Sequence, residues 1–381
     1  MNILIYFDNA ATTFPKPNIV KNNIKSIFNK FGGNPGRSGH NMAMETSLMI
    51  YSCREALAKL FGAHNTEDVV FCLNCTMAIN MAIKGILSPG DHVIISSYEH
   101  NAVLRPIHKL KQLGLITYDI ADIYENDIDK TLSSYKRLIK RNTKLIIAIH
   151  GSNVFGNILP VKEISDIAHK NGAMFLIDAA QTAGVIPINI QELNIDFFCA
   201  PGHKSLYGLS GIGILITNHG KRLSTVIEGG TGSLSQSFSQ PDFMPDRLES
   251  GTVNTAGILG LYNGLKFINQ RGITNIYSHE MKIIQYIYNR LSNNKNIILY
   301  TDYPSLNTYL PVLSFNVKDM SCDEVIKNLN EKGFALRGGL HCAPLAHQSK
   351  GTLEIGTVRI SVGAFNTVAQ ANKLCNAISS L

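Results

Sequence analysis

The sequence lacks tryptophan, internal repeats and low-complexity tracts, and only 13 of its 381 residues are proline. This composition excludes collagen-like and disordered chains, while a hydrophobic content of 45% is enough for a large core. No apolar run is long enough to span a membrane, and the apolar start, residues 1–7, is shorter than a signal peptide. We therefore expect a soluble cytoplasmic protein that does not bind membranes.

Charge is also sparse, since charged residues make up only 17% of the chain. The 35 Lys and Arg residues exceed the 28 Asp and Glu residues by a net charge of +7, and they are scattered apart from one short run at 136–141. Such a run is typical of the solvent-exposed face of a helix. We expect no nucleic-acid partner.

The seven cysteines are odd in number and irregularly spaced, which argues against a disulfide framework and favours a reducing compartment. Cys72 and Cys75 form a C-x-x-C pair, but no second pair or histidine cluster at zinc-ligand spacing accompanies them. The polar Asn74 just before Cys75 indicates a helix start at this point. We expect no metal site.

The region from residue 50 to 220 alternates short apolar runs with amphipathic stretches, as in a mainly parallel sheet with crossover helices. Several runs contain only large apolar residues, which is typical of strands buried on both faces. Helices are predicted at 77–86 and 161–171. The predicted strands are 69–73, 92–96, 144–150, 173–177, 197–200 and 213–217. The fold class is therefore α/β.

The pattern changes after residue 254, where a long helical stretch at 256–291 precedes a smaller mixed set. A chain of 381 residues exceeds the size at which one core usually stops growing. We predict a large domain, 15–255, and a smaller α+β domain, 256–381 together with residues 1–14, joined by one continuous helix. The smaller set comprises strands 312–317, 334–336 and 358–362 and helices 322–332 and 368–381.

Two polar residues follow buried strands of the predicted parallel sheet. Asp178 ends one apolar run, and Lys204 emerges from the next into a loop of small residues. Ligands of parallel α/β sheets bind at these carboxyl ends. A partly desolvated lysine can form a Schiff base with an aldehyde, and a carboxylate can partner the protonated ring nitrogen of pyridoxal 5'-phosphate (PLP). Asp178 taken alone could equally be a helix cap.

These residues belong to a series of segments whose order and spacing resemble the class V aminotransferase superfamily over essentially the whole chain. The likeness is greatest to the branch of cysteine desulfurases and selenocysteine lyases. It implies PLP-dependent transferase fold type I, with a mainly parallel seven-stranded sheet in the large domain. The matching segments are 7–13, Glu99-His100, 152–156, 178–181, 202–204, Gly251-Thr252, 337–342 and Arg359.

The resemblance implies that His100 lies flat on the PLP ring, although a capping or core histidine is the alternative. Cys75 and Thr76 would bind the phosphate at a helix N-terminus, where the helix dipole favours an anion. Pro201 departs from the family pattern, because relatives commonly have a serine there. One phosphate contact is therefore expected to be missing or supplied by Ser205 or a water.

Other cofactor contacts follow from the same likeness. Gln181 and Asn153 would bond the ring hydroxyl oxygen or the substrate, and His203 would reach the phosphate. Thr252 would contribute to the phosphate site of a neighbouring subunit, which implies a homodimer.

Cys342 is the candidate nucleophile, because it lies among Gly, His and Pro in a loop-like context after a short strand. The nearby Arg337 and His341 could favour its thiolate form. Arg359 alternates with apolar residues on a predicted strand, and its guanidinium can bind an amino-acid carboxylate through two hydrogen bonds. The resemblance makes Arg359, with Asn153 and Arg337, the substrate-binding set; a surface salt bridge is the alternative for Arg359.

The predicted function is a PLP-dependent cysteine desulfurase that converts L-cysteine to L-alanine, forms a persulfide on Cys342 and passes the sulfur to an acceptor protein. A selenocysteine lyase acting on L-selenocysteine, for which the thiol is less necessary, remains open. So does another class V aminotransferase or lyase, which would not need Cys342. A non-catalytic scaffold would have no reason to keep Lys204, Asp178 and His100 together.

Overall fold

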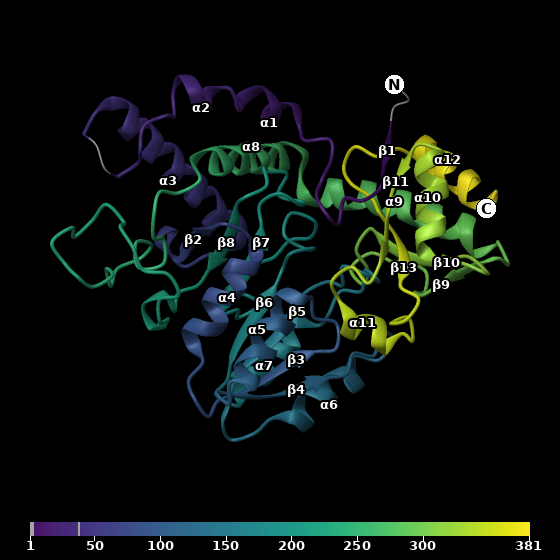
Figure 1. The fold of residues 1–381 in the computed structure, drawn as a ribbon, viewed down its shortest axis with the longest axis horizontal. Coiled ribbons are helices and arrows are strands. Elements are labelled where there is room, and N and C mark those ends of the chain that lie inside the picture. Colours follow the sequence, from purple (N-terminus) through teal and green to yellow (C-terminus); the bar gives the residue numbers. More distant parts are fainter. Residues whose placement is uncertain (1–3, 37–38) are drawn as a thin grey trace.

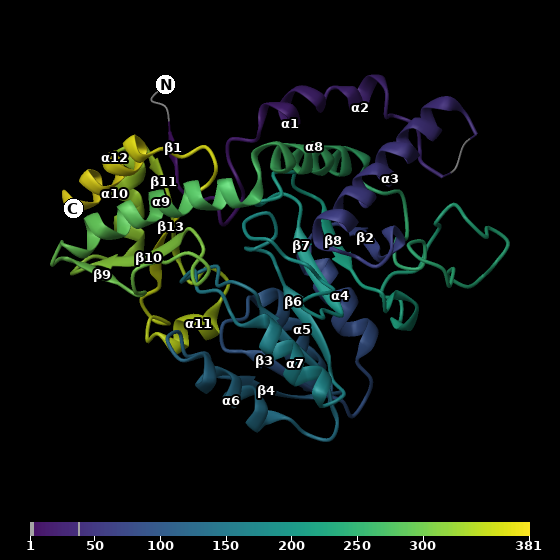
Figure 2. The same ribbon diagram turned by 180° about the vertical axis from the view of Figure 1, so that it is seen from behind.

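The computed structural model describes residues 4–36 and 39–381 and contains a large sheet flanked by helices beside a smaller sheet (Figures 1 and 2). The large sheet has seven strands in the order β2-β8-β7-β6-β5-β3-β4. All neighbouring pairs from β7 to β4 are parallel, whereas β8 is antiparallel to both of its neighbours. The strands are β2 Val69–Cys72, β3 His92–Ser96, β4 Thr117–Ala121, β5 Thr143–Ile149, β6 Met174–Asp178, β7 Phe197–Pro201 and β8 Gly213–Ile216. The α/β, mainly parallel prediction is confirmed.

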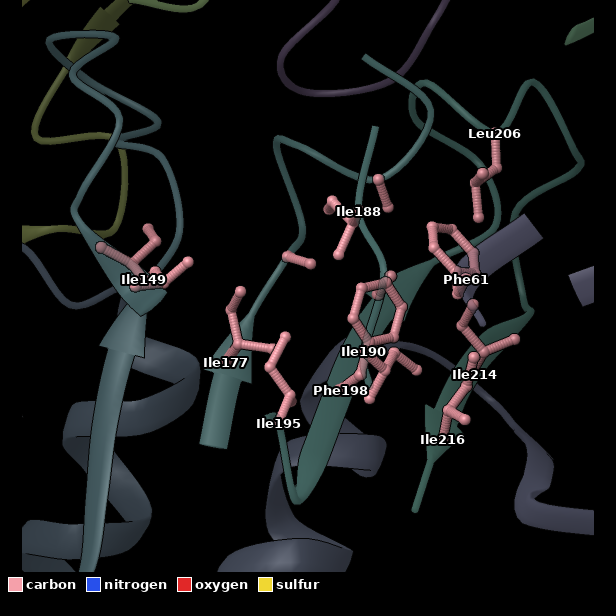
Figure 3. Close-up of a cluster of buried hydrophobic side chains, with 14 of the residues drawn as sticks. Phe61, Ile149, Ile177, Ile188, Ile190, Ile195, Phe198, Leu206, Ile214 and Ile216 are labelled. Atoms are coloured by element: carbon pink, nitrogen blue, oxygen red, sulfur yellow. The ribbon is translucent and has the colours of Figure 1, made fainter. Parts of the chain in front are cut away.

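Helices cover both faces of this sheet. One face packs on α3 (Asn41–Phe61), α6 (Ile128–Leu138), α7 (Val161–Lys170) and α8 (Thr255–Arg271), and Figure 3 shows side chains of this core. The other face packs on α4 (Cys75–Ile86) and α5 (Asn101–Gln112). Burial on both faces explains why the central strands are continuous apolar runs.

The smaller sheet is antiparallel, in the order β12-β13-β10-β9, and has a separate hydrophobic core. Its strands are β9 Ile297–Leu299, β10 Val312–Val317, β12 Arg337–Gly339 and β13 Thr357–Ser361, and its helices are α9 Ile273–Ser292, α10 Cys322–Glu331 and α12 Val368–Ser379. A two-stranded parallel sheet joins β1 (Ile5–Tyr6) to β11 (Phe334–Ala335), so the N-terminal segment lies beside C-terminal residues. The short helices are α1 Asn18–Asn23, α2 Ser26–Asn29 and α11 Pro344–Ser349, with 3-10 turns at Thr66–Asp68 and Gly220–Arg222.

The expected continuous helix at 256–291 is wrong, because α8 ends and α9 begins at Gly272. This residue has φ +80°, which is outside the helical region and suits glycine. Most buried side chains of α8 belong to the core of the large sheet, and most of those of α9 to the core of the smaller one. The domain division at 255/256 stays a prediction. Across 4–36 and 39–381, no helix is both long and apolar enough to cross a membrane.

Candidate active site

A cavity of about 240 Å³ lies where β5, β6 and β7 end, at the carboxyl edge of the large sheet. Ligands of parallel α/β sheets bind at this edge. Side chains from the N-terminal segment and from the smaller sheet close the cavity from the other side. Ten predicted site residues line it: Cys75, Thr76, His100, Asn153, Asp178, Gln181, His203, Lys204, Arg337 and Arg359.

Asp178 is the last residue of β6, and Lys204 lies in the loop after the neighbouring strand β7, as predicted. Burial lowers the pKa of the Lys204 amine, an effect that the negative charge of Asp178 opposes. Burial also raises the pKa of Asp178, although its Oδ1 accepts a hydrogen bond from the Ala180 N–H at 2.9 Å. In the described residues no hydrogen bond or ion pair involves the Lys204 amine. The buried Lys204 amine therefore loses its proton more readily than the amine of an exposed lysine.

The N-terminus of α4 faces the same cavity. Asn74 caps the helix by accepting from the Met77 N–H at 2.9 Å, while the N–H groups of Cys75 and Thr76 have no hydrogen-bond acceptor among the described residues. Gly213 on β8 permits this approach, because a Cβ there would lie 2.3 Å from the Asn74 carbonyl carbon. Two free N–H groups at the positive end of a helix suit a phosphate.

His100 lines the cavity and caps α5 at the same time. Its Nδ1 accepts from the Ala102 N–H at 3.0 Å, so its ring proton is on Nε2. Burial, helped by the charge of Lys204, lowers the pKa of His100 to about 4. His100 is therefore a capping histidine, as the alternative prediction had it, and Nδ1 is the capping atom. The same residue also lines the cavity.

The N-terminal segment also lines the cavity, and it contacts two of the predicted site residues. Gln181 donates from Nε2 to the Ala10 carbonyl at 3.0 Å, and His203 Nδ1 lies 3.1 Å from the Thr12 hydroxyl. Burial lowers the pKa of His203 to about 4. Pro201 lines the cavity but Ser205 does not, so the structure does not support Ser205 as the substitute for the missing serine.

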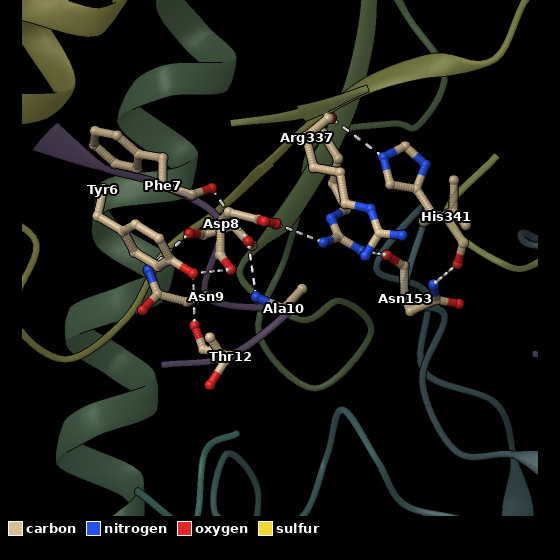
Figure 4. A network of polar contacts seen from close by, with 12 residues as sticks. Tyr6, Phe7, Asp8, Asn9, Ala10, Thr12, Asn153, Arg337 and His341 are labelled. Atoms are coloured by element: carbon tan, nitrogen blue, oxygen red, sulfur yellow. Dashed lines mark hydrogen bonds and ion pairs between the residues drawn. The ribbon is translucent and has the colours of Figure 1, made fainter. Parts of the chain in front are cut away.

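Arg359 is 1% exposed. It bonds Asp8 and Asn153, two of the residues labelled in the polar network of Figure 4. One Nη donates to Asp8 Oδ1 at 2.7 Å and the other to the Asn153 carbonyl at 2.8 Å, while the buried Nε has no partner. The surface salt bridge considered for Arg359 is excluded by its burial. Three of its five N–H groups remain for a carboxylate.

Cys342 is exposed and lies next to the cavity rather than in its wall. An Arg337 Nη is 3.9 Å from its Sγ, in agreement with the expected proximity. The expected contribution of His341 is wrong, because its ring turns inward and bonds the Arg337 carbonyl at 3.2 Å. Burial lowers the pKa of His341 to about 3, so the ring is neutral near pH 7.

Thr252 lies outside this cavity, in a separate surface pocket with Leu73 and Ile227. Its predicted role at a neighbouring subunit stays a prediction. Asp8 was not among the predicted site residues, although its segment, 7–13, was noted for the resemblance. No local signal links Asp8 to Arg359, since they are 351 residues apart.

The residues present fit PLP. A desolvated amine suits its aldehyde, a buried carboxylate suits its ring nitrogen, and free helical N–H groups suit its phosphate. His100 lines the same cavity as these groups.

Comparison with known proteins identifies the class of this fold and site. The sequence profile of the aminotransferase class-V family matches residues 5–374, so the chain belongs to that family. A probable cysteine desulfurase of Methanothermobacter thermautotrophicus is 31% identical over 95% of this chain and 91% of its own. One from Mycolicibacterium paratuberculosis is 33% identical over 98% of this chain, which spans 55% of that longer protein.

Solved structures agree with this placement. The apo structure of a cysteine desulfurase from Thermococcus onnurineus NA1 has a TM-score of 0.91 and 27% identity, covering 99% of this chain and 94% of its own. A cysteine desulfurase from Escherichia coli has a TM-score of 0.88 with the same identity and coverage. Within the class V aminotransferases the chain belongs to the cysteine desulfurase family, with PLP fold type I.

Proposed function

We propose that this protein is a PLP-dependent desulfurase that converts L-cysteine to L-alanine and holds the released sulfur as a persulfide on Cys342. The observation that carries the proposal is the exposed Cys342 thiol beside a cavity that contains Lys204 and Asp178. A transaminase needs the amine and carboxylate but has no use for this thiol. The relatives named as cysteine desulfurases support the same choice.

The described side chains suggest how PLP is held. Lys204 would bond its aldehyde, Asp178 its ring nitrogen, and the α4 N-terminus with Thr76 and His203 its phosphate, while His100 would cover one ring face. When bound, PLP supplies an electron sink for the electron pair released at the substrate carbon. Asp178 maintains that capacity by keeping a proton on the ring nitrogen.

Lys204 moves the substrate proton. Burial lowers the pKa of its amine, so Nζ gives up its own proton more readily than an exposed lysine, and the neutral amine can then accept the α-proton of the substrate. The free N–H groups of Arg359, with the exposed Arg337 at the cavity wall, bind the substrate carboxylate.

Cys342 completes the reaction. Its thiolate attacks the substrate sulfur, forming an S–S bond while the C–S bond breaks and its electron pair stays with the β-carbon of the substrate. The β-carbon takes up a proton and the α-carbon regains the proton held by Lys204, so cysteine and the enzyme thiol become alanine and an enzyme persulfide with no other oxidant or reductant. An acceptor protein or a small thiol then removes the outer sulfur.

We further propose that the protein works as a cytoplasmic homodimer in which Thr252 reaches the neighbouring subunit's phosphate site. Support comes from exposed apolar side chains near Thr252: Leu73 is 61% and Ile227 50% exposed. A second copy that covered these residues would bury them. Sedimentation of the purified protein tests the dimer.

The decisive experiment compares wild type with Cys342→Ala after PLP loading, with the cofactor absorbance, alanine and sulfide all measured. Alanine formation from L-cysteine should fall by about a hundredfold or more while the absorbance band stays. Full activity of the variant would remove the nucleophile assignment. If wild type released selenium from L-selenocysteine but made no alanine from L-cysteine, the selenocysteine lyase would be favoured. Absence of the cofactor absorbance band after PLP loading would overturn the assignment of Lys204 as the residue that binds PLP.

A further inference from the structure

The chain between β12 and β13 leaves the smaller sheet and packs into the core of the large one. Ala343 and Ala346 are 0% exposed and belong to the same core cluster as Phe155 and Tyr98. Cys342 lies near the beginning of this segment, and α11 begins two residues later at Pro344. The position of the thiol therefore depends on how α11, labelled in the ribbon of Figure 1, is fixed to the large sheet.

The loop ahead of α11 has an unusual backbone. His341 and Cys342 have φ values of 50° and 58°, two consecutive left-handed residues that are not glycine. Such conformations persist only when surrounding contacts hold them. The Asn153 side chain donates to the His341 carbonyl, and the Asn101 N–H to the Cys342 carbonyl, each at 2.7 Å. These bonds hold the loop at one end of the segment.

A partly buried ion pair holds the other end. Lys350, the residue after α11, lies 2.7 Å from Glu125, and the two side chains are only 24% and 9% exposed. The Tyr98 hydroxyl donates to the other Glu125 oxygen at 2.8 Å, and the Lys350 amine lies over the Phe155 ring at 5.7 Å. Because both side chains are largely shielded from water, removing one partner would leave the other charge poorly solvated and unpaired, which destabilises the contact more than breaking a surface pair does.

Aromatic contacts connect the two ends. The His347 ring on α11 lies 5.8 Å from the Phe155 ring and stacks at 5.8 Å on the ring of His341, the neighbour of Cys342. A shift of α11 would thus be transmitted to the loop through rigid rings.

We propose that Lys350, Glu125 and Tyr98 are positioning residues that clamp α11 to the large sheet and so fix the Cys342 thiol at the cavity. They do not touch the reacting atoms. The proposal deepens the proposed function, on which its kinetic part rests. Attack on sulfur requires a thiolate held near van der Waals contact, and a misplacement of ~1 Å can cost about a hundredfold in rate.

The experiment uses the PLP-loaded protein and the variants Lys350→Met, Glu125→Gln and Lys350→Arg. Met removes the charge but keeps the length, Gln keeps an acceptor for Tyr98, and Arg can still pair with Glu125. Lys162→Met is the matched control, since Lys162 pairs with Asp166 on the exposed surface of α7. For L-cysteine, kcat should fall about tenfold or more in the Met and Gln variants with KM nearly unchanged, while Arg restores most of it.

A second readout needs no activity. The rate of Cys342 alkylation by iodoacetamide, followed by peptide mass, should rise severalfold in Lys350→Met because the loop opens more often, and stay at the wild-type value in Lys162→Met. Unchanged alkylation and unchanged kcat would overturn the clamp, as would an equal loss in the control. If wild type made no alanine, the proposed function would fail, but alkylation would still decide whether the clamp exists.

Discussion

At the scale of single residues, His100 combines two functions in one ring. Its Nδ1 accepts a hydrogen bond in the first turn of α5, and its side chain also lines the cavity. The two functions can be separated because asparagine is also a good N-cap, whereas phenylalanine offers a flat ring without an acceptor.

His100→Asn should keep the unfolding free energy of the apoprotein within about 0.5 kcal/mol of wild type but weaken PLP binding. His100→Phe should do the opposite, losing about 1 kcal/mol of stability and keeping more cofactor affinity. Denaturant unfolding and PLP titration measure the two effects. Equal behaviour of the two variants would show that only one of the functions matters.

Most site residues could be predicted from the sequence because they follow buried strands. Asp178 and Lys204 come after apolar runs, and the topology of a parallel sheet brings such positions together. The partners of Arg359 and the inward turn of His341 could not be predicted, since both depend on contacts between distant segments. Lys350 and Glu125 look like ordinary surface charges in the sequence.

At the scale of elements, the start of α4 depends on a glycine in another strand. Gly213→Ala would place a Cβ 2.3 Å from the backbone of Asn74, which cannot yield as a side chain can. We expect a loss of about 1–3 kcal/mol in stability and a marked loss of PLP affinity, because β8 and α4 must separate. Gly32→Ala is the control, since that glycine has no positive φ and an added Cβ would meet its neighbours only at 3.5 Å or more. PLP affinity equal to wild type in Gly213→Ala would contradict this role.

The predicted strands of the large sheet are confirmed within a residue or two, but β4 was missed. Its sequence, Thr117–Ala121, lies at the sheet edge, and its side chains are partly exposed, so it lacks the apolar run that reveals the others. The break at Gly272 was missed for a related reason. The apolar period continues through it, and a single glycine inside a helical pattern is often tolerated.

At the scale of the whole molecule, buried ionisable groups set the pH range of stability. Burial lowers the pKa of six histidines, to about 3 or 4 in five of them: His92, His100, His150, His203, His341 and His347. Their contribution is present above pH ~6.5 and is lost as the pH falls through the folded values. Burial raises the pKa of Glu99 and Glu280 to about 8, so their contribution is lost as the pH rises from ~4.5 to 8.

The apoprotein should therefore be most stable near pH ~6.5, with the unfolding midpoint falling on both sides. Glu280→Gln should flatten the alkaline side and leave the acid side unchanged. Thermal unfolding from pH 4 to 9 at constant ionic strength tests this. A midpoint that stayed level down to pH 4 would contradict the histidine contribution.

The bond between Asp8 and Arg359 joins residues 351 positions apart, and Asn9 bonds the Ser361 carbonyl across 352. At ribosomal speeds of about 5–20 residues per second, Arg359 is synthesised roughly 20–70 s after Asp8. In the later part of that time the growing chain already carries Asp178 and Lys204 but lacks the wall that Arg359 and the N-terminal segment build together. A half-made polypeptide thus has an incomplete reaction chamber, because one wall is assembled only when the N-terminal and C-terminal segments meet.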